Sequence, residues 1–277
     1  MTKKYDLHSH SSLSDGVLSP KELVYRAQLQ GVDVLALTDH DTTAGYEEAN
    51  TAANYVGIDL VSGIELSVSW QNMSFHVVGL GINPNYTPLL EATQYLQTVR
   101  HERAKKIATK LEKKRITGAL EAVTTAAGDS MITRTHFANF LVSQNHVSSQ
   151  QEAFDRYLAK GKPAYVATAW AELELAVSWI NQSGGVAVLA HPMRYKLSAN
   201  WMKRLLTAFK LAGGQGIEVV TGRCSMDEIK ILTNYAQNFE LAGSVGSDFH
   251  NPANQWVELG RMVPLPTNVK PVWELFN

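Results

Sequence analysis

Short apolar segments that end in histidine, aspartate or glutamate recur along this chain, with amphipathic helical segments between them. The first of these, residues 5–16, reads Y-D-L-H-S-H-S-S-L-S-D-G. His8 and His10 lie two residues apart in a predicted strand, so both rings project from one face, and Asp15 follows on a serine-rich loop. Two imidazoles and a carboxylate at one strand end suit a divalent metal, although paired histidines on a strand also occur as ordinary surface residues.

The alternation of strands and helices predicts a parallel α/β sheet or barrel. Residues 32–41 read V-D-V-L-A-L-T-D-H-D, an apolar run that suits a strand buried on both faces. A capping box with proline at the first helical position, S-P-K-E, opens the helix before it. Further strands are predicted at residues 58–64 (ending at Glu65), 74–80, 186–190, 217–220 and 241–247. Helices are predicted at residues 19–30, 44–55, 168–182, 200–212 and 225–238.

The alternation breaks near Asn83-Pro84. Residues 87–161 show helical periodicity without a convincing buried strand, and helices are predicted at 87–115, 120–127, 136–142 and 150–159. We therefore predict a discontinuous α/β domain, residues 1–83 and 164–277, and a helical insertion, residues 84–163, that covers one end of the sheet.

Length and composition fit one large α/β domain that carries such an insertion. The chain has 277 residues, of which 45% are hydrophobic and 18% charged, and a formal net charge of -1, which argues against general coating of nucleic acid by the whole surface. The single cysteine, Cys224, excludes an internal disulfide framework. No apolar run approaches the ~20 residues needed to span a bilayer, and the N-terminus lacks the apolar region of a signal peptide, so we expect a cytoplasmic protein with no membrane partner.

Six of the nine histidines fall in or at the ends of predicted strands, together with three carboxylates. The full set is His8, His10, Asp15, His40, Glu65, His76, His191, Asp248 and His250. Because the carboxyl ends of parallel strands converge, we expect these residues to form a site for two or three metal ions, with Glu65 as a bridge. The alternative for any single member is a packed or helix-capping side chain, most of all for His76 among valines. A mixed nitrogen and oxygen shell favours Mn, Fe or Zn over Mg or Ca. Asp39 and Asp41 are expected either to hold metal ligands in position without binding the metal themselves, or to cap helices.

Several motifs together resemble the polymerase and histidinol phosphatase (PHP) family. They are, in chain order, D-L-H-S-H, L-T-D-H-D, G-I-E, A-H-P and S-D-F-H. The segments I-T-R-T-H-F-A, G-K-P-A-Y-V, A-H-P-M-R-Y and G-G-Q-G-I-E-V resemble its branch of 3',5'-nucleoside bisphosphate phosphatases, which includes a 5'-to-3' exoribonuclease that trims ribosomal RNA ends. The likeness extends over essentially the whole chain. It implies a distorted (β/α)7 barrel with a trinuclear metal site.

The resemblance also implies how the ligands divide among three divalent ions, with Mn expected and Zn or Fe as alternatives. One ion takes His8, His10, Glu65 and Asp248; a second takes Glu65, His76 and His191; a third takes Asp15, His40 and His250. Asp15 stands where several relatives carry a histidine. Neither a G-x-S-x-G elbow nor a histidine motif around Cys224 is present, so the expected nucleophile is a metal-activated water, and no general acid is assigned.

The insertion is expected to select the substrate. Between Arg100 and Arg115 there are eight Lys or Arg and two Glu, and a solvated helix face accounts for most of them. By the resemblance, Arg103 and Arg134 lie near the substrate, where guanidinium groups grip phosphate bidentately. Further candidates for substrate binding are Arg100, His136, Lys160, Lys162, Arg194, Asp15 and His40. His136 is either a phosphate donor or a helix-packing residue.

These features predict a metal-dependent phosphoesterase. The expected reactions are removal of the 3'-phosphate from nucleoside 3',5'-bisphosphates, which gives the 5'-monophosphate, and 5'-to-3' trimming of short 5'-phosphorylated RNA. One alternative is a histidinol-phosphate phosphatase, against which the helical insertion argues. Another is a PHP module that binds metal without catalysis. No obligate protein partner is evident.

Overall fold

An eight-stranded sheet organises the computed structural model, which describes residues 3–276. Seven strands lie side by side in the order β1-β2-β3-β4-β6-β7-β8, and β5 pairs with β3. The strands are β1 (Tyr5–Asp6), β2 (Val34–Leu37), β3 (Asp59–Trp70), β4 (Met73–Leu80), β5 (Ala171–Glu172), β6 (Val186–Leu189), β7 (Gly216–Thr221) and β8 (Ala242–Gly246). Strand β4 runs antiparallel to both neighbours, whereas the other pairs are parallel.

The two edges of this sheet meet, so that it nearly closes into a barrel. The backbone N–H of Leu7, after β1, donates to the carbonyl of Val245 in β8 at 2.9 Å, and Asp248 N–H donates to the carbonyl of His8 at 2.8 Å. Closure removes the exposed edges that an open sheet would leave. The predicted distorted β/α barrel is thereby confirmed, with one antiparallel strand that the alternation of elements did not predict.

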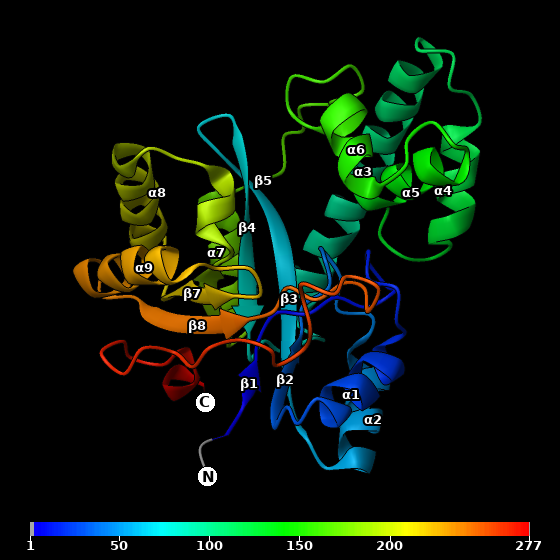
Figure 1. Ribbon diagram of the computed structural model, residues 1–277. Coiled ribbons are helices and arrows are strands. Elements are labelled where there is room, and N and C mark those ends of the chain that lie inside the picture. Colours follow the sequence, from blue (N-terminus) through cyan, green and yellow to red (C-terminus); the bar gives the residue numbers. More distant parts are fainter. Residues whose placement is uncertain (1–2, 277) are drawn as a thin grey trace.

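Helices cover the barrel and extend from one end of it (Figure 1). They are α1 (Pro20–Leu29), α2 (Tyr46–Val56), α3 (Thr87–Glu112), α4 (Ala119–Ala127), α5 (Arg134–Ser143), α6 (Gln150–Ala153), α7 (Leu173–Gln182), α8 (Ala199–Leu211) and α9 (Met226–Asn238), with a π-turn η1 (Phe154–Leu158) and 3₁₀ turns η2 (Pro192–Tyr195) and η3 (Val272–Leu275). The expected capping box of α1 is present, since Ser19 and Glu22 each accept from the other's backbone N–H. Among the described residues, no helix combines the length and apolar character that a membrane crossing requires.

Two predicted boundaries were wrong, and in each case pairing with another segment of the sheet explains the difference. Strand β3 does not end at Glu65 but continues to Trp70, because its second half pairs with β4 in a hairpin. Helix α7 begins at Leu173 rather than near residue 168. The preceding segment is held against β3 instead, with Trp170 N–H donating to Ser69 Oγ at 2.9 Å and Ala171 paired with Val68.

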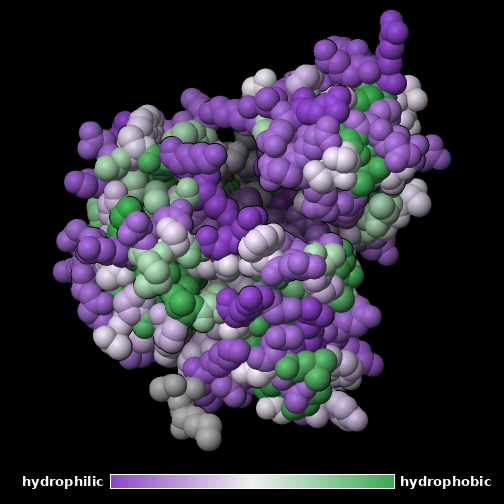
Figure 2. Space-filling model, viewed as in Figure 1, coloured by the Kyte–Doolittle hydropathy of each residue, from purple (hydrophilic) through white to green (hydrophobic). Residues whose placement is uncertain are grey.

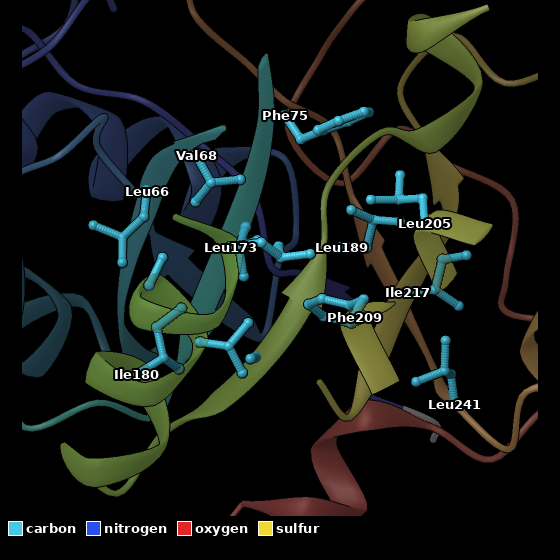
Figure 3. Close-up of a cluster of buried hydrophobic side chains, with 14 of the residues drawn as sticks. Leu66, Val68, Phe75, Leu173, Ile180, Leu189, Leu205, Phe209, Ile217 and Leu241 are labelled. Atoms are coloured by element: carbon cyan, nitrogen blue, oxygen red, sulfur yellow. The ribbon is translucent and has the colours of Figure 1, made fainter. Parts of the chain in front are cut away.

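The barrel has distinct inner and outer apolar surfaces. Val186, Val188 and Ala190 pack inside with Val78 and Leu80, in the alternation expected of a strand. The intervening residues of the same strands face outward and pack under helices α7, α8 and α9. Figure 3 shows part of this outer cluster: Leu173 and Ile180 of α7 lie near Leu66 and Val68 of β3, and Leu205 and Phe209 of α8 lie near Ile217 of β7, with Leu189 of β6 between the two groups.

Helices α3 to α6 have an apolar cluster of their own. It contains Ile107 and Leu111 of α3, Val123 of α4, and Phe137 and Leu141 of α5. The first turns of α3, however, pack in the outer cluster of the barrel through Leu89 and Leu96. Helix α3 therefore belongs to both parts, and the division into residues 1–83 with 164–277 and residues 84–163 stays a prediction.

The close approach of β8 to β1 makes Gly246 a test of barrel closure. A Cβ added at Gly246 would lie 2.3 Å from Cβ and 2.8 Å from the backbone nitrogen of His8. Because backbone atoms cannot yield, we expect Gly246→Ala to lower the free energy of unfolding by about 1–3 kcal/mol, measured by urea denaturation.

Gly243 on the same strand supplies the matched control. Its added Cβ would meet the side-chain ends of Val269 and Leu265, at 2.6 and 2.9 Å, which can move. Gly243→Ala should therefore cost less than Gly246→Ala. Equal losses for the two variants would contradict the account of closure.

Candidate metal centre and active-site cleft

Glu65 occupies the centre of the candidate site because of its register in the sheet. It pairs with Val78 across the β3–β4 hairpin, and Ser67 pairs with His76. Directly opposed residues share a face, so Glu65 and His76 project to the interior side, where Val78 also lies. The Glu65 side chain is fully buried there.

Five imidazoles surround the Glu65 carboxylate. Oε1 lies 3.0 Å from His76 Nδ1, 3.0 Å from His191 Nε2 and 3.4 Å from His8 Nε2. Oε2 lies 2.9 Å from His40 Nδ1 and 3.3 Å from His10 Nε2. Both oxygens of one carboxylate thus face nitrogen atoms that come from five separate positions in the chain.

A second carboxylate, Asp15, faces His250 and also His40 at the cleft side of the site. Its Oδ1 lies 3.2 Å from His250 Nε2 and 3.7 Å from His40 Nε2. Asp248 completes the arrangement, with Oδ1 3.2 Å from His10 Nε2 and 3.5 Å from His8 Nε2. All nine residues predicted as ligands therefore lie in one contiguous cluster.

Three groups within this cluster have the spacing of metal-binding sites. In each, one ligand atom per residue lies within 4.8 Å of the others. The groups are His10, Asp15, His40 and His250; His8, His10 and Glu65; and His40, Glu65 and His76. Several of these atoms, Asp15 Oδ1, His40 Nδ1 and Glu65 Oε2, are buried and make no hydrogen bond within residues 3–276. Buried polar atoms without hydrogen bonds are costly, so this donor set fits divalent cations.

Strained backbone directs some of these side chains inward. His191 and Asp248 have positive φ values of 29° and 55°, and Asp41, next to His40, has φ 53°. Non-glycine residues adopt such angles only where surrounding contacts impose them, and they concentrate at functional sites. All three residues follow strands that run into the site, namely β2, β6 and β8.

Glu218 is a supporting residue that the sequence analysis missed. It lies on β7, accepts from His8 Nδ1 at 2.6 Å and accepts from the backbone N–H of His191 at 2.5 Å. The first bond leaves His8 Nε2 free to face Glu65, as outer carboxylates do for metal-binding histidines. The motif G-I-E-V on a predicted strand could have indicated it, because a glutamate in a buried parallel strand needs a partner.

Asp39 and Asp41 also support the site, and neither caps a helix within residues 3–276. Asp39 accepts from Ser11 N–H at 2.8 Å and from Ser14 Oγ at 2.6 Å, which holds the loop that leads to Asp15. Asp41 accepts from Ser67 N–H at 2.6 Å. The two aspartates thereby fix the positions of loops that carry predicted ligands. Of the two expected roles, the geometry favours support of ligands over helix capping.

The central carboxylates are ionised. Burial favours the neutral acid, but the neighbouring imidazoles, His76 and then His40, outweigh it and hold the pKa of Glu65 well below its usual value. For Asp15, burial is likewise outweighed by His250 and His40, and its pKa is held well below the usual range. Ionised carboxylates in a buried position are strong ligands for cations.

A cleft of ≈ 390 Å³ opens from this cluster toward the helices α3 to α6. Figure 2 shows the hollow between those helices and the barrel, with mainly hydrophilic side chains around it. Asp15, His40 and His76 form its inner end. The other polar residues that line it include Arg100, Arg103, Thr133, Arg134, Thr135, Lys160, Tyr165 and Arg194.

Arg103 and Arg134 are positive charges without an acidic partner in this cleft. Neither forms an ion pair with a carboxylate among the described residues, and the buried Nε of Arg103 makes no hydrogen bond there. Their guanidinium groups lie over the rings of Trp170 and Phe154, at 5.1 and 5.6 Å from the centroids. Burial, followed by the like charges of Arg134 and Arg100, lowers the pKa of Arg103 to about 9. Guanidinium groups without an acidic partner are suitable donors to carboxylate or phosphate oxygens, so the predicted role of this pair is compatible with the geometry.

The other predicted substrate residues differ in their surroundings. Arg100 is buried and donates to Asp41 at 2.8 Å, Ser67 at 3.0 Å and the carbonyl of Ile132 at 3.2 Å, so its guanidinium is committed to the protein. Arg194 pairs with Asp248. Lys160 lines the cleft, whereas Lys162 is absent from its lining.

His136 caps a helix. Its Nδ1 accepts from the backbone N–H of Thr133 at 3.1 Å and completes the capping box at the start of α5. Of the two roles considered for this histidine, the geometry favours the structural one. The neighbouring Thr135 instead contacts the cluster of predicted ligands, because its hydroxyl donates to Asp15 Oδ2 at 2.9 Å.

Known proteins resemble this chain over its whole length. The chain is 46% identical over 276 residues to a "5'-3' exoribonuclease" of Haemophilus influenzae, with 100% of both chains covered. It is 42% identical over 269 residues to a "3',5'-nucleoside bisphosphate phosphatase" of Chromobacterium violaceum, covering 97% of this chain and 94% of the relative. A solved structure of an amidohydrolase from Chromobacterium violaceum with bound sulfate has a TM-score of 0.94 at 42% identity, covering 98% of this chain and 95% of that one.

A family model supports the same assignment. The model described as PHP domain matches residues 6–221. This range includes seven of the nine clustered residues, all except Asp248 and His250. Both relatives are hydrolases of phosphate esters by their names. The chain belongs to the PHP domain family.

Proposed function

We propose that this chain is a metal-dependent phosphoesterase that acts on substrates with a phosphate at the 5' position. It removes the 3'-phosphate of nucleoside 3',5'-bisphosphates and releases nucleotides from the 5' end of short phosphorylated RNA. One observation carries the proposal: a single cleft joins the cluster of histidines and carboxylates to two arginines that have no acidic partner. The names of the full-length relatives agree with both activities.

The nine clustered residues are proposed to hold the metal ions, in the division that the family resemblance implies. Glu65 lies in two of the three groups with suitable spacing, which supports its role as a bridge. A shell of imidazoles and carboxylates favours Mn²⁺ over Mg²⁺ or Ca²⁺, and three ions accommodate the nine residues. Bound there, the cations would neutralise phosphate oxygens, activate a water molecule and stabilise the departing oxygen.

Arg103 and Arg134 are proposed to bind the 5'-phosphate. They lie in the same cleft as Asp15 and His40 but on the helical side, on α3 and α5. A phosphate at the metal cluster already has cations to neutralise it. The second phosphate, across the ribose, requires partners from the protein, and guanidinium groups offer two parallel hydrogen bonds each.

Both activities break the same kind of bond. In a 3',5'-bisphosphate, water adds to the 3' phosphorus and O3' leaves with a proton as the hydroxyl. In RNA, hydrolysis of the O3'–P bond between the first two nucleotides gives a 5'-mononucleotide and a shortened strand that keeps its 5'-phosphate. One placement of the 5'-phosphate and O3' therefore serves both substrates.

A comparison of three substrates tests the proposal. Adenosine 3',5'-bisphosphate, histidinol phosphate and a short 5'-phosphorylated RNA are incubated with the Mn²⁺-loaded protein, and phosphate or nucleotide release is measured. We expect turnover of the first and third and little of the second. Preferential hydrolysis of histidinol phosphate would support the alternative phosphatase, and turnover of none would support a module that binds metal without catalysis.

Glu65→Gln should remove both bound metal and activity. The substitution replaces a shared anionic ligand with a neutral amide, so we expect kcat/KM to fall by more than about 100-fold, the upper end of what loss of a supporting partner costs. Metal content, measured by elemental analysis, should fall as well. Chelation of the unaltered protein should abolish activity, and Mn²⁺ should restore it.

Glu121→Gln, at an exposed position of α4, is the control and should leave both quantities unchanged. A Glu65→Gln variant with full metal content and full activity would refute the assignment. So would a fully active protein that contains no transition metal.

Arg103→Ala and Arg134→Ala should discriminate between substrates. A charge-assisted contact contributes roughly 1.5–3 kcal/mol, so each variant should lose about tenfold to a hundredfold in kcat/KM on adenosine 3',5'-bisphosphate. The loss should largely disappear with adenosine 3'-monophosphate, which lacks the 5'-phosphate. Each variant and the unaltered protein are assayed with both substrates.

Lys162→Ala serves as the control, because Lys162 is absent from the lining of the cleft. If an arginine variant loses the same factor on both substrates, the arginine acts on the chemistry or on the fold instead. That result would contradict its proposed contact with the 5'-phosphate.

A further inference from the structure

A smaller cleft of ≈ 240 Å³ adjoins the metal cluster on the side of β6 and β7. It lies between the segments that follow these two parallel strands, and His191, whose Nε2 is 3.0 Å from Glu65, forms part of its wall. Arg194 lines both this cleft and the larger one. The two clefts therefore border one side chain, Arg194, which pairs with Asp248 of the cluster.

The smaller cleft carries uncompensated positive charge. Lys196 and Arg223 line it, are exposed, and form neither an ion pair nor a side-chain hydrogen bond within residues 3–276. Its one acidic residue, Glu228, accepts instead from the backbone N–H and hydroxyl of Ser225, at 2.8 and 2.9 Å. An anionic ligand would thus meet two free cations rather than existing ion pairs.

The reaction on RNA requires space at this position. A 3',5'-bisphosphate ends at its reacting phosphate. In RNA, the same phosphate also carries the O5' of the second nucleotide, so the strand must continue beyond the metal cluster. The larger cleft, with Arg103 and Arg134, is assigned to the first nucleotide and its 5'-phosphate, which leaves the smaller cleft for the continuing strand.

We infer that Lys196 and Arg223 bind the phosphodiester backbone of the RNA on the 3' side of the bond that is cut. This inference rests on the proposed function and adds a second binding surface to it. Neither residue lines the larger cleft, which is assigned to the first nucleotide. After hydrolysis the shortened strand, which retains a 5'-phosphate, stays bound by this surface and can return its new 5' end to the larger cleft.

The double variant Lys196→Ala/Arg223→Ala tests the inference. On a short 5'-phosphorylated RNA, kcat/KM should fall by about tenfold or more at low salt, whereas turnover of adenosine 3',5'-bisphosphate should remain unchanged. For single strands the slope of log K against log salt is about 0.7 for each phosphate contact, so the dependence of RNA cleavage on salt should become shallower by up to about 1.4.

Two further variants separate the contact from general charge and from folding. Lys203→Ala/Lys230→Ala removes the same charge from exposed positions of α8 and α9 outside the cleft, and should behave as the unaltered protein. Lys196→Arg/Arg223→Lys keeps both charges and should retain most RNA cleavage and the original salt slope.

The outcomes are distinct. Equal loss on RNA and bisphosphate in the Lys196→Ala/Arg223→Ala variant would overturn the inference, because the residues would then act on the metal cluster or the fold. The inference would also be overturned if the Lys196→Ala/Arg223→Ala variant cleaved RNA as well as the Lys203→Ala/Lys230→Ala control does. If the unaltered protein hydrolyses the bisphosphate but not RNA, this inference fails while the phosphatase activity stands; if it hydrolyses neither, the proposed function itself fails.

Discussion

The burial of the Glu65 carboxylate is the constraint on which the rest of the site depends. A buried charge without compensation is costly, and this one faces five imidazole nitrogens within 3.4 Å. Burial first, and then like charges, lowers the pKa of His10 to about 3 and that of His76 to about 4, so these rings are neutral. Neutral imidazoles and ionised carboxylates at such distances leave lone pairs facing one another, and divalent cations between them would satisfy both.

The helices that form the other wall of the cleft are attached to this cluster at two points. Arg100 of α3 donates to Asp41, which follows His40, and to Ser67, two residues after Glu65. Thr135 of α5 donates to Asp15. Helices α3 and α5 also carry the arginines proposed to bind the 5'-phosphate, so these contacts set the distance between that phosphate and the metal cluster. A substrate of fixed length across its ribose requires such a fixed distance.

The sequence predicted the parts of this structure that depend on local patterns. Apolar runs, capping boxes and terminal glycines located most helices and strands, and the motifs located the nine clustered residues. What it did not predict depends on pairing between distant segments. The extension of β3 to Trp70 requires its antiparallel partner β4, and the late start of α7 requires the contact of Trp170 with Ser69. Likewise, the hydrogen bond from Arg100 to Asp41 depends on the packed fold. In the sequence, an arginine of a basic stretch that binds substrate cannot be told from one that pairs with a buried carboxylate.

The segment from His191 to Lys196 contributes side chains to both clefts. Its two end residues have positive φ values, 29° and 51°, and enclose the 3₁₀ turn η2. This geometry directs His191 toward Glu65, pairs Arg194 with Asp248, and leaves Lys196 exposed in the smaller cleft. The hydroxyl of Tyr195 accepts from the backbone N–H of His76 at 2.9 Å, which ties the turn to β4. One short turn thus carries a residue of the histidine–carboxylate cluster, a residue shared by both clefts and a cation of the smaller cleft. In the proposed function, this turn would couple the position of RNA beyond the cut bond to the position of the cluster.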